Sequence, residues 1–201
     1  GDTTTYSYCW YDSNNSEMGY FGYLPINSDN LGDVSSLTVV EQNQTTYDEA
    51  SQAVLATNWQ RFDDSTGFGP LNGPNDSQPK ARRSYMAQWY DGVGRNVASA
   101  NYGTNGGAVL VRPDVSPERS DTVLVSITRF KDDGEANATI DPMGIETRWE
   151  NDDAGRRIRL IENYAACGND PDTNRTTEYA YAPDGGMSRL TLINEVTGNQ
   201  V

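Results

Sequence analysis

One turn pattern recurs along the chain and constrains its fold more than any other feature. An aromatic residue ends a segment of alternating polar and apolar residues, and a five-residue turn with at least one acidic side chain follows it. A short carboxylate can cap its own turn, and a glycine at the fourth position accepts the positive φ that tight hairpins need. The pattern therefore predicts β-hairpins. Such turns begin at Asp48, Asp91, Lys131, Asp152 and Ala182, with Ser51 in place of glycine in the first.

The spacing of these turns indicates an internal repeat. Successive turns begin 43, 40, 21 and 30 residues apart. Three of these intervals are close to one or two multiples of about 21, and the fourth contains an insertion at 165–175. A further turn, Asp141–Gly144, divides the stretch 122–163 into a four-stranded meander. We therefore predict an all-β fold, an antiparallel hairpin meander in which each unit packs on its neighbours.

The same pattern divides the chain. Residues 1–44 are expected to form a degenerate N-terminal repeat followed by an irregular insert. Residues 45–201 are expected to form the repeat sheet, with irregular loops at 63–80, 102–120 and 165–175, where Gly, Pro, Asn and Asp are frequent. Between Tyr47 and Phe62 the alanine spacing fits a short helix as well as strands, so both remain open.

Composition excludes several function classes. The chain carries 15 basic and 29 acidic residues, a net charge of −14, and has no histidine and two cysteines. Without histidine there is no Ser-His-Asp triad and no His-ligated zinc, and two cysteines cannot form a four-cysteine zinc site. The acidity disfavours binding to nucleic acid and to anionic membrane surfaces. No apolar run reaches the length of about 20 residues that a membrane helix needs, so we expect no membrane insertion.

The turn pattern resembles a known family. Trp89 to Arg95 reads as an aromatic pair, Asp, two residues and Gly-Arg, and Asp152, Gly155 and Arg156 repeat it. This resembles the YD repeat of the RHS (rearrangement hotspot) proteins, whose animal relatives are the teneurins. The resemblance covers roughly residues 45–62, 82–101 and 122–195. It implies a strip of antiparallel hairpins that spirals as a β-solenoid into the wall of a hollow shell, which encloses a toxin or stands on a cell surface.

From that resemblance we expect a structural role without catalysis. The chain would be a fragment of a longer polypeptide, secreted or at the cell surface, with no cofactor and no metal. Its partners would be the remainder of its own polypeptide and either an enclosed toxin domain or a surface glycan. The family's self-cleaving core, which contains an Asp-Pro-x-Gly motif, is not recognisable. Asp141–Gly144 has that motif but lies within the regular spacing of the repeats, so we interpret it as an ordinary turn. The alternative is a carbohydrate-binding cell-surface module.

Most candidate residues are assigned to turns and have a structural role. Arg95 and Arg156 are expected to form ion pairs with aspartates of adjacent hairpins. The structural turn positions are Asp48, Asp91, Gly94, Arg95, Asp141, Gly144, Asp152, Gly155, Arg156 and Gly185.

The ligand-binding candidates are fewer. Trp59 and Trp10 are the candidate platforms for a sugar ring, whereas Trp89 and Trp149, at repeat positions, are expected to be structural. Asp170 begins a stretch of oxygen ligands that lacks the spacing of an EF-hand. Cys9 and Cys167 can pair only if the N-terminal strand lies beside the 165–175 insertion, and we expect two free, half-buried thiols.

Overall fold

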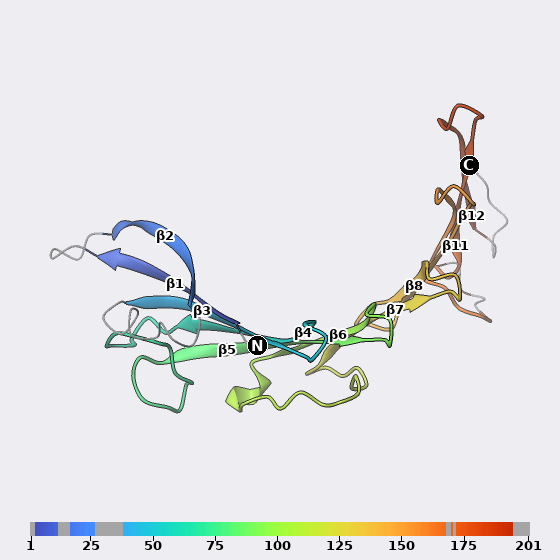
Figure 1. The fold of residues 1–201 in the computed structure, drawn as a ribbon. Helices are drawn as coiled ribbons and strands as arrows, with labels where there is room; N and C mark the ends of the chain where they lie inside the picture. The colour runs from blue at the N-terminus through green and yellow to red at the C-terminus, as the bar shows by residue number, and fades with distance from the viewer. Residues whose placement is uncertain (1–2, 12–16, 27–37, 168–169, 171, 195–201) are drawn as a thin grey trace. The chain divides into compact units, whose positions relative to one another are not determined.

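The structure is a computed structural model that describes residues 3–11, 17–26, 38–167, 170 and 172–194, with side chains only between residues 38 and 193. Within it the chain forms two compact units, residues 1–124 and 125–201. Apart from one 3-10 turn, the secondary-structure elements of the described residues are all β-strands (Figure 1). The elements are β1 (Thr3–Tyr11), β2 (Glu17–Ile26), β3 (Val39–Tyr47), β4 (Ala53–Arg61), β5 (Ala81–Tyr90), β6 (Asn96–Gly103), the 3-10 turn η2 (Asn105–Gly107), β7 (Leu124–Phe130), β8 (Ala136–Ile140), β9 (Glu146–Asn151), β10 (Arg157–Glu162), β11 (Arg175–Tyr181) and β12 (Met187–Asn194).

In the first unit the strands lie in the order β6-β5-β4-β3-β1-β2, all antiparallel. Strands β3 to β6 form a meander, but β1 lies between β2 and β3, so β2 and β3 are not neighbours in the sheet. The sequence-based division at 44/45 lies within β3, which pairs with β1 and β4. Of the two alternatives left open for the segment from Tyr47 to Phe62, the structure shows the strand, because most of that segment is β4.

One face of this sheet is the core of the first unit. Tyr85, Ala87 and Trp89 alternate along β5 and are buried, and Ala98 and Ala100 of β6 are buried beside them. Alternate residues of a strand share a face, so these side chains lie on one side of the sheet.

Two long loops cover that face. In the loop 63–80, Leu71 is buried and its N–H donates to Gln42 Oε1 at 2.9 Å. In the segment 104–123, the Pro113 carbonyl accepts a hydrogen bond from Trp89 Nε1 at 3.1 Å. The loops that interrupt the sequence repeat therefore form the second layer of this unit.

In the second unit, β7 to β12 pair in chain order as one antiparallel meander. The prediction of an all-β antiparallel hairpin meander is confirmed. The core here is thin, and the buried residues of its main face are Val125, Ala138, Ile161 and Thr176. In register, Ala138 faces Arg148, which faces Ile161. The charged residues of β9 thus lie on the same face as these apolar side chains.

The described residues contain no helix of the length and apolarity that a membrane crossing requires.

Candidate functional site

Six turns in the described part of the chain share one geometry. In each, the N–H of the first residue donates to the carbonyl of the fifth, and the N–H of the fourth donates to the carbonyl of the first, at 2.8–3.0 Å. The fourth residue has a φ between 62° and 93°. This is a type I turn followed by a left-handed residue, a frequent three-residue hairpin loop. The left-handed residues are Ser51, Gly94, Gly134, Gly144, Gly155 and Gly185.

A carboxylate caps the fifth N–H of every one of these turns. Where the turn begins with aspartate, as at Asp48, Asp91, Asp141 and Asp152, the first side chain accepts this bond at 2.8–2.9 Å. In the turns that begin with Lys131 and Ala182, the third residue takes over: Asp133 and Asp184 accept the bond at 2.9 and 3.0 Å. The aspartate side chains are therefore hydrogen-bonded to the backbone of their own turns.

The turn arginines pair inside their own hairpin. Arg95 Nε lies 2.7 Å from Asp91 Oδ2, and Arg156 Nη2 lies 2.7 Å from Asp152 Oδ2. The expectation of ion pairs with adjacent hairpins is wrong, because the turn already brings its first and fifth side chains together. The Arg95 N–H holds the pKa of Asp91 below its usual value, as the Arg156 guanidinium does for the pKa of Asp152.

Two pairs of adjacent hairpins, one pair in each unit, are joined by a tyrosine hydroxyl. The hydroxyl of Tyr90, which precedes one turn, lies 3.0 Å from the carbonyl of Ala53, the residue that follows the preceding turn of its unit, and 2.7 Å from Gln88 Oε1, so its one hydrogen is shared between two acceptors. At the same place in the second unit, Tyr181 donates to the carbonyl of Arg157 at 2.8 Å. We call this arrangement the inter-hairpin tyrosine contact. At the second of these contacts the Arg156 guanidinium also lies 4.5 Å from the centre of the Tyr181 ring.

The tryptophans are held by arginines. Guanidinium groups of Arg83, Arg112 and Arg157 lie 5.1, 4.9 and 4.9 Å from the ring centres of Trp59, Trp89 and Trp149. Trp59 is half-buried, and its indole N–H is enclosed without a partner among the described atoms. The Trp10 side chain lies outside the described residues.

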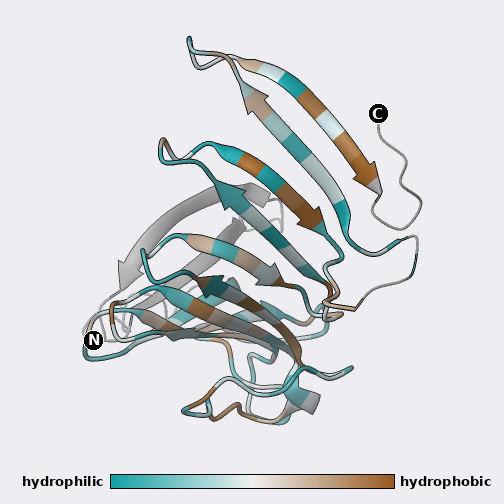
Figure 2. Ribbon diagram, turned by 90° about the vertical axis from the view of Figure 1, so that its right-hand side faces the viewer, coloured by the Kyte–Doolittle hydropathy of each residue, from teal (hydrophilic) through white to brown (hydrophobic). Residues whose placement is uncertain are grey.

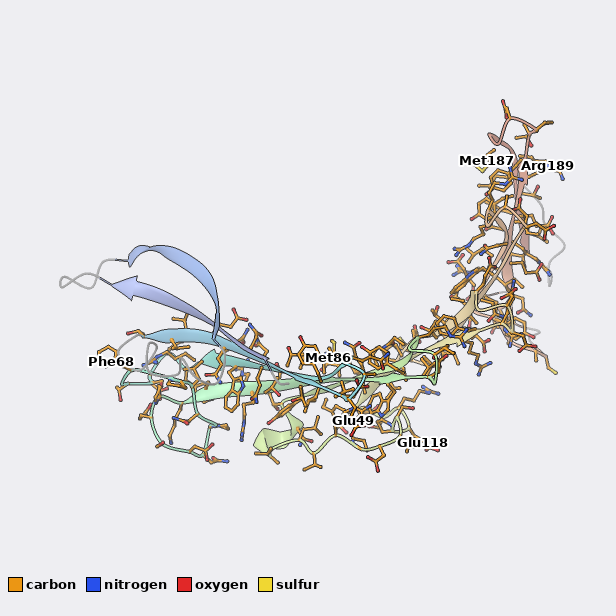
Figure 3. The ribbon with its side chains drawn as sticks, in the orientation of Figure 1. Glu49, Phe68, Met86, Glu118, Met187 and Arg189 are labelled. Atoms are coloured by element: carbon orange, nitrogen blue, oxygen red, sulfur yellow. The ribbon has the colours of Figure 1, made fainter. Side chains whose placement is uncertain are left out.

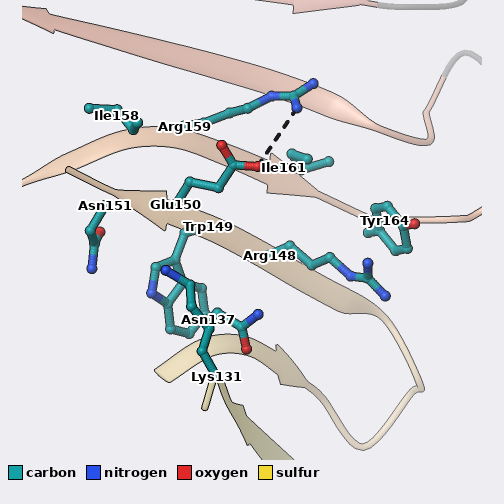
Figure 4. A pocket seen from close by; sticks show the side chains of 10 residues that line it. All are labelled: Lys131, Asn137, Arg148, Trp149, Glu150, Asn151, Ile158, Arg159, Ile161 and Tyr164. Carbon is teal, nitrogen blue, oxygen red and sulfur yellow. Dashed lines mark ion pairs between the residues drawn. The ribbon is translucent and has the colours of Figure 1, made fainter. Parts of the chain in front are cut away.

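A cleft of about 590 Å³ opens in the second unit (Figure 4). Strands β8 and β9 pair over only three residue pairs, from Ala138↔Arg148 to Ile140↔Glu146. Beyond them Trp149 and Asn137 line the gap together with Lys131 (Figure 4). The cations that line this cleft each have an ion-pair partner, at distances from 2.6 to 4.0 Å. The sequence offers no signal for this cleft, because it arises where the pairing of two strands ends.

A second, shallow groove of about 240 Å³ crosses the uncovered face of the first unit. Asn43, Asn58, Ser84 and Asn101 line it, from four successive strands. Asn58 Nδ2 donates to Asn43 Oδ1 at 2.8 Å and to Glu41 Oε1 at 2.6 Å. The groove is therefore rich in fixed amide groups.

The remaining candidates lie in the insertion. Asp170 Oδ1 accepts the N–H of Asp172 at 2.9 Å, so it caps its own turn, and no group of three or more acidic or cysteine side chains within the described residues is arranged to hold a metal. Cys167 is a free thiol and is exposed rather than half-buried. The Cys9 side chain lies outside the described residues.

The chain matches no protein-family model, and no curated protein matches it. Among solved structures it is similar to a mutant form of the Tc holotoxin pore of Photorhabdus luminescens, with 11% identity and a TM-score of 0.26. That similarity covers 97% of this chain and 13% of the other, so the chain spans about an eighth of the protein it matches.

Proposed function

We propose that this chain is a structural wall segment of an RHS-type, YD-repeat shell, and that it performs no catalysis. In the longer polypeptide the wall would enclose a toxin or other cargo, or present a surface outside the cell. The resemblance of the turn motifs to the YD repeat suggests this function. The observation that carries it is the inter-hairpin tyrosine contact, which occurs in the same place in both units.

This contact supports a wall because it recurs at the same position of one hairpin junction in each unit. At these two junctions the later hairpin offers a tyrosine hydroxyl and the earlier hairpin offers a backbone carbonyl. Backbone pairing alone specifies neither the partner nor the register, whereas a hydroxyl-to-carbonyl contact beside a turn favours one register. In the capped turns the aspartate carboxylates accept backbone N–H groups of their own turn, so this proposal gives them a structural role and no catalytic one.

The test is to read the coding frame on both sides of residues 1–201 and then to image the purified natural product by electron microscopy. We expect the pattern of aromatic, Asp, two residues and Gly-Arg to continue on at least one side, and the particle to contain an enclosed space. A frame without further repeats, or a particle without an interior, would overturn the proposal.

The second candidate function is recognition of a surface glycan, for which the amide groove is the favourable observation. Fixed amides are suited to sugar hydroxyls, and the Arg83 guanidinium already lies over the ring of Trp59. On a glycan panel, this function predicts binding that Asn58→Ala abolishes and that Asn105→Ala, a change of the same kind outside the groove, leaves intact. Absence of binding to every glycan removes this candidate.

A further inference from the structure

Strand β12 is the outermost strand of the second unit, and no described strand pairs with its outer edge. Polar and apolar residues alternate along it from Arg189 to Leu192 (Figure 2). Leu190 and Leu192, on one face, are 46% and 47% exposed, and Met187 is 60% exposed (Figure 3). A free edge with exposed leucines on a regular strand is a template for pairing with another chain.

An occupied edge of the same kind within this unit shows what such a strand would contact. Strand β10 follows the turn at 152–156 as β12 follows the turn at 182–186. The strand pairs β9–β10 and β11–β12 each have a register shift beside the turn. In this alignment Arg157, Arg159 and Leu160 correspond to Met187, Arg189 and Leu190. The outer edge of β10 is occupied by β11.

Three features of the β10–β11 junction define its chemistry. Tyr181 donates its hydroxyl to the carbonyl of Arg157 at 2.8 Å. Glu178 lies directly across from Arg159 in register, so opposite charges face each other. Leu160 faces Thr177 and is half-buried, whereas its counterpart Leu190 is exposed.

The first unit has the same arrangement with a different pair of side chains. There Tyr90 contacts the carbonyl of Ala53, and Leu55 lies across from Ala87 at the register of Arg159 and Glu178. The tyrosine contact is thus common to both junctions. The facing pair that lies two residues further from the turn differs between the junctions. It consists of two apolar residues, Leu55 and Ala87, in the first unit and of two oppositely charged residues, Arg159 and Glu178, in the second.

We propose that the outer edge of β12 binds an antiparallel β-hairpin of this same repeat type, whose first strand carries a glutamate three residues before a tyrosine. The tyrosine hydroxyl donates to the carbonyl of Met187, the glutamate faces Arg189, and the strand covers Leu190. The glutamate follows from charge complementarity with Arg189, which is exposed and occupies the position that Arg159 has in β10. The repeat type of the partner rests on the proposed function, but the edge and its charge do not.

The probe is the chain's own β11–β12 hairpin, residues 175–194, made as a synthetic peptide, because β11 has the required spacing from Glu178 to Tyr181. Arg175 and Asn194 face each other in register. A D-Pro-Gly link between them closes the peptide and reduces the entropy that a free hairpin loses on binding. A fluorescent label on the link reports binding to the intact chain by anisotropy.

The decisive measurement is a charge exchange. We expect saturable binding of the peptide, weakened about tenfold when Glu178 of the peptide is changed to Lys, because like charges then face each other. The chain variant Arg189→Glu should weaken binding of the unchanged peptide and restore binding of the Glu178→Lys peptide. The chain variant Arg175→Glu, an equal change of charge on another exposed arginine, is the control and should not restore it.

Each outcome has a definite meaning. Absence of saturable binding overturns the proposal, and so does binding that the charge exchange does not alter, since the peptide is then at another edge. Hydrogen exchange on the intact chain should also show new protection confined to β12. The imaging experiment can fail while this one succeeds, in which case the edge binds hairpins but the chain is no shell wall.

Discussion

At the scale of single residues, a left-handed fourth position and a carboxylate cap produce each hairpin turn. Gly155 has a φ of 75°, and no atom lies within 4 Å of the position that a Cβ would take. Any cost of a side chain there is therefore a backbone cost and not a steric clash. The glycine position in the sequence pattern reflects this single dihedral angle.

Gly155→Val is expected to destabilise the chain by more than about 1 kcal/mol, because a β-branched residue is strongly disfavoured at positive φ. Thermal unfolding measures the effect. Gly92→Val is the matched control, since Gly92 is a turn residue with open space around it and no positive φ. Equal melting temperatures for the two variants would contradict the role given to Gly155.

The tyrosine contact can be tested by removing one atom. Tyr181→Phe keeps the ring beside Arg156 but removes the donor to the Arg157 carbonyl, and we expect a loss of about 0.5–1.5 kcal/mol in the free energy of unfolding. Tyr179→Phe is the control, because the Tyr179 hydroxyl makes no hydrogen bond in the described part of the chain. If both variants unfold at the same denaturant concentration, the contact contributes nothing.

The turn carboxylates predict loss of stability in acid. The pKa values of Asp91 and Asp152 are lowered in the folded chain. Their contribution is therefore complete above the unfolded pKa of about 3.9 and is lost as the pH falls through the lower folded pKa. Asp152→Asn should make the melting temperature fall less steeply below about pH 4. Asp153→Asn, which removes the same charge one residue along, should keep the steeper fall of the unmodified chain.

At the scale of elements, a buried amide of the sheet contacts the loop 63–80, in addition to the Arg61 guanidinium, which donates to the carbonyls of Ser65 and Gly67. Gln42 is 6% exposed and its Oε1 accepts the Leu71 N–H. A loop whose buried backbone group is satisfied in this way becomes part of the packed structure. The same applies to the segment 104–123, where the indole of Trp89 reaches a backbone carbonyl.

Gln42→Leu should destabilise the chain by about 1–3 kcal/mol, because the Leu71 N–H stays buried without an acceptor. Proteolytic cleavage within residues 63–80 should become faster at the same time. Gln44→Leu, on the same strand and the same face, is the control. Unchanged cleavage in Gln42→Leu would show that other contacts hold the loop.

At the scale of the whole molecule, the chain is two compact units with one repeat geometry. A disulfide between Cys9 and Cys167 would join β1 of the first unit to the insertion of the second. Cys167 is free and exposed, so we expect it to react with a thiol reagent in the native chain. We also expect the melting temperature to be the same with and without a reducing agent. A lower melting temperature under reduction would reveal a disulfide.

Sequence and structure contributed differently at each scale. Turn positions and strand alternation are local, and from them the six turns and the meander of β7 to β12 could be predicted. The partners of Arg95 and Arg156 could not be assigned correctly, because the side-chain geometry within the turn decides them. The place of β1 between β2 and β3 has no local signal, since pairing between strands distant in sequence depends on the folded sheet.

The sequence by itself determined that this chain is an antiparallel hairpin meander, because glycine positions and period-two alternation act through neighbouring residues alone. Only the tertiary structure decided which groups join one hairpin to the next. It placed the hydroxyls of Tyr90 and Tyr181 on carbonyls of the preceding hairpins, and it placed the charges of β9 beside Ala138 and Ile161. These contacts depend on strand register, which fixes the face and the neighbour of every side chain only once the sheet has formed.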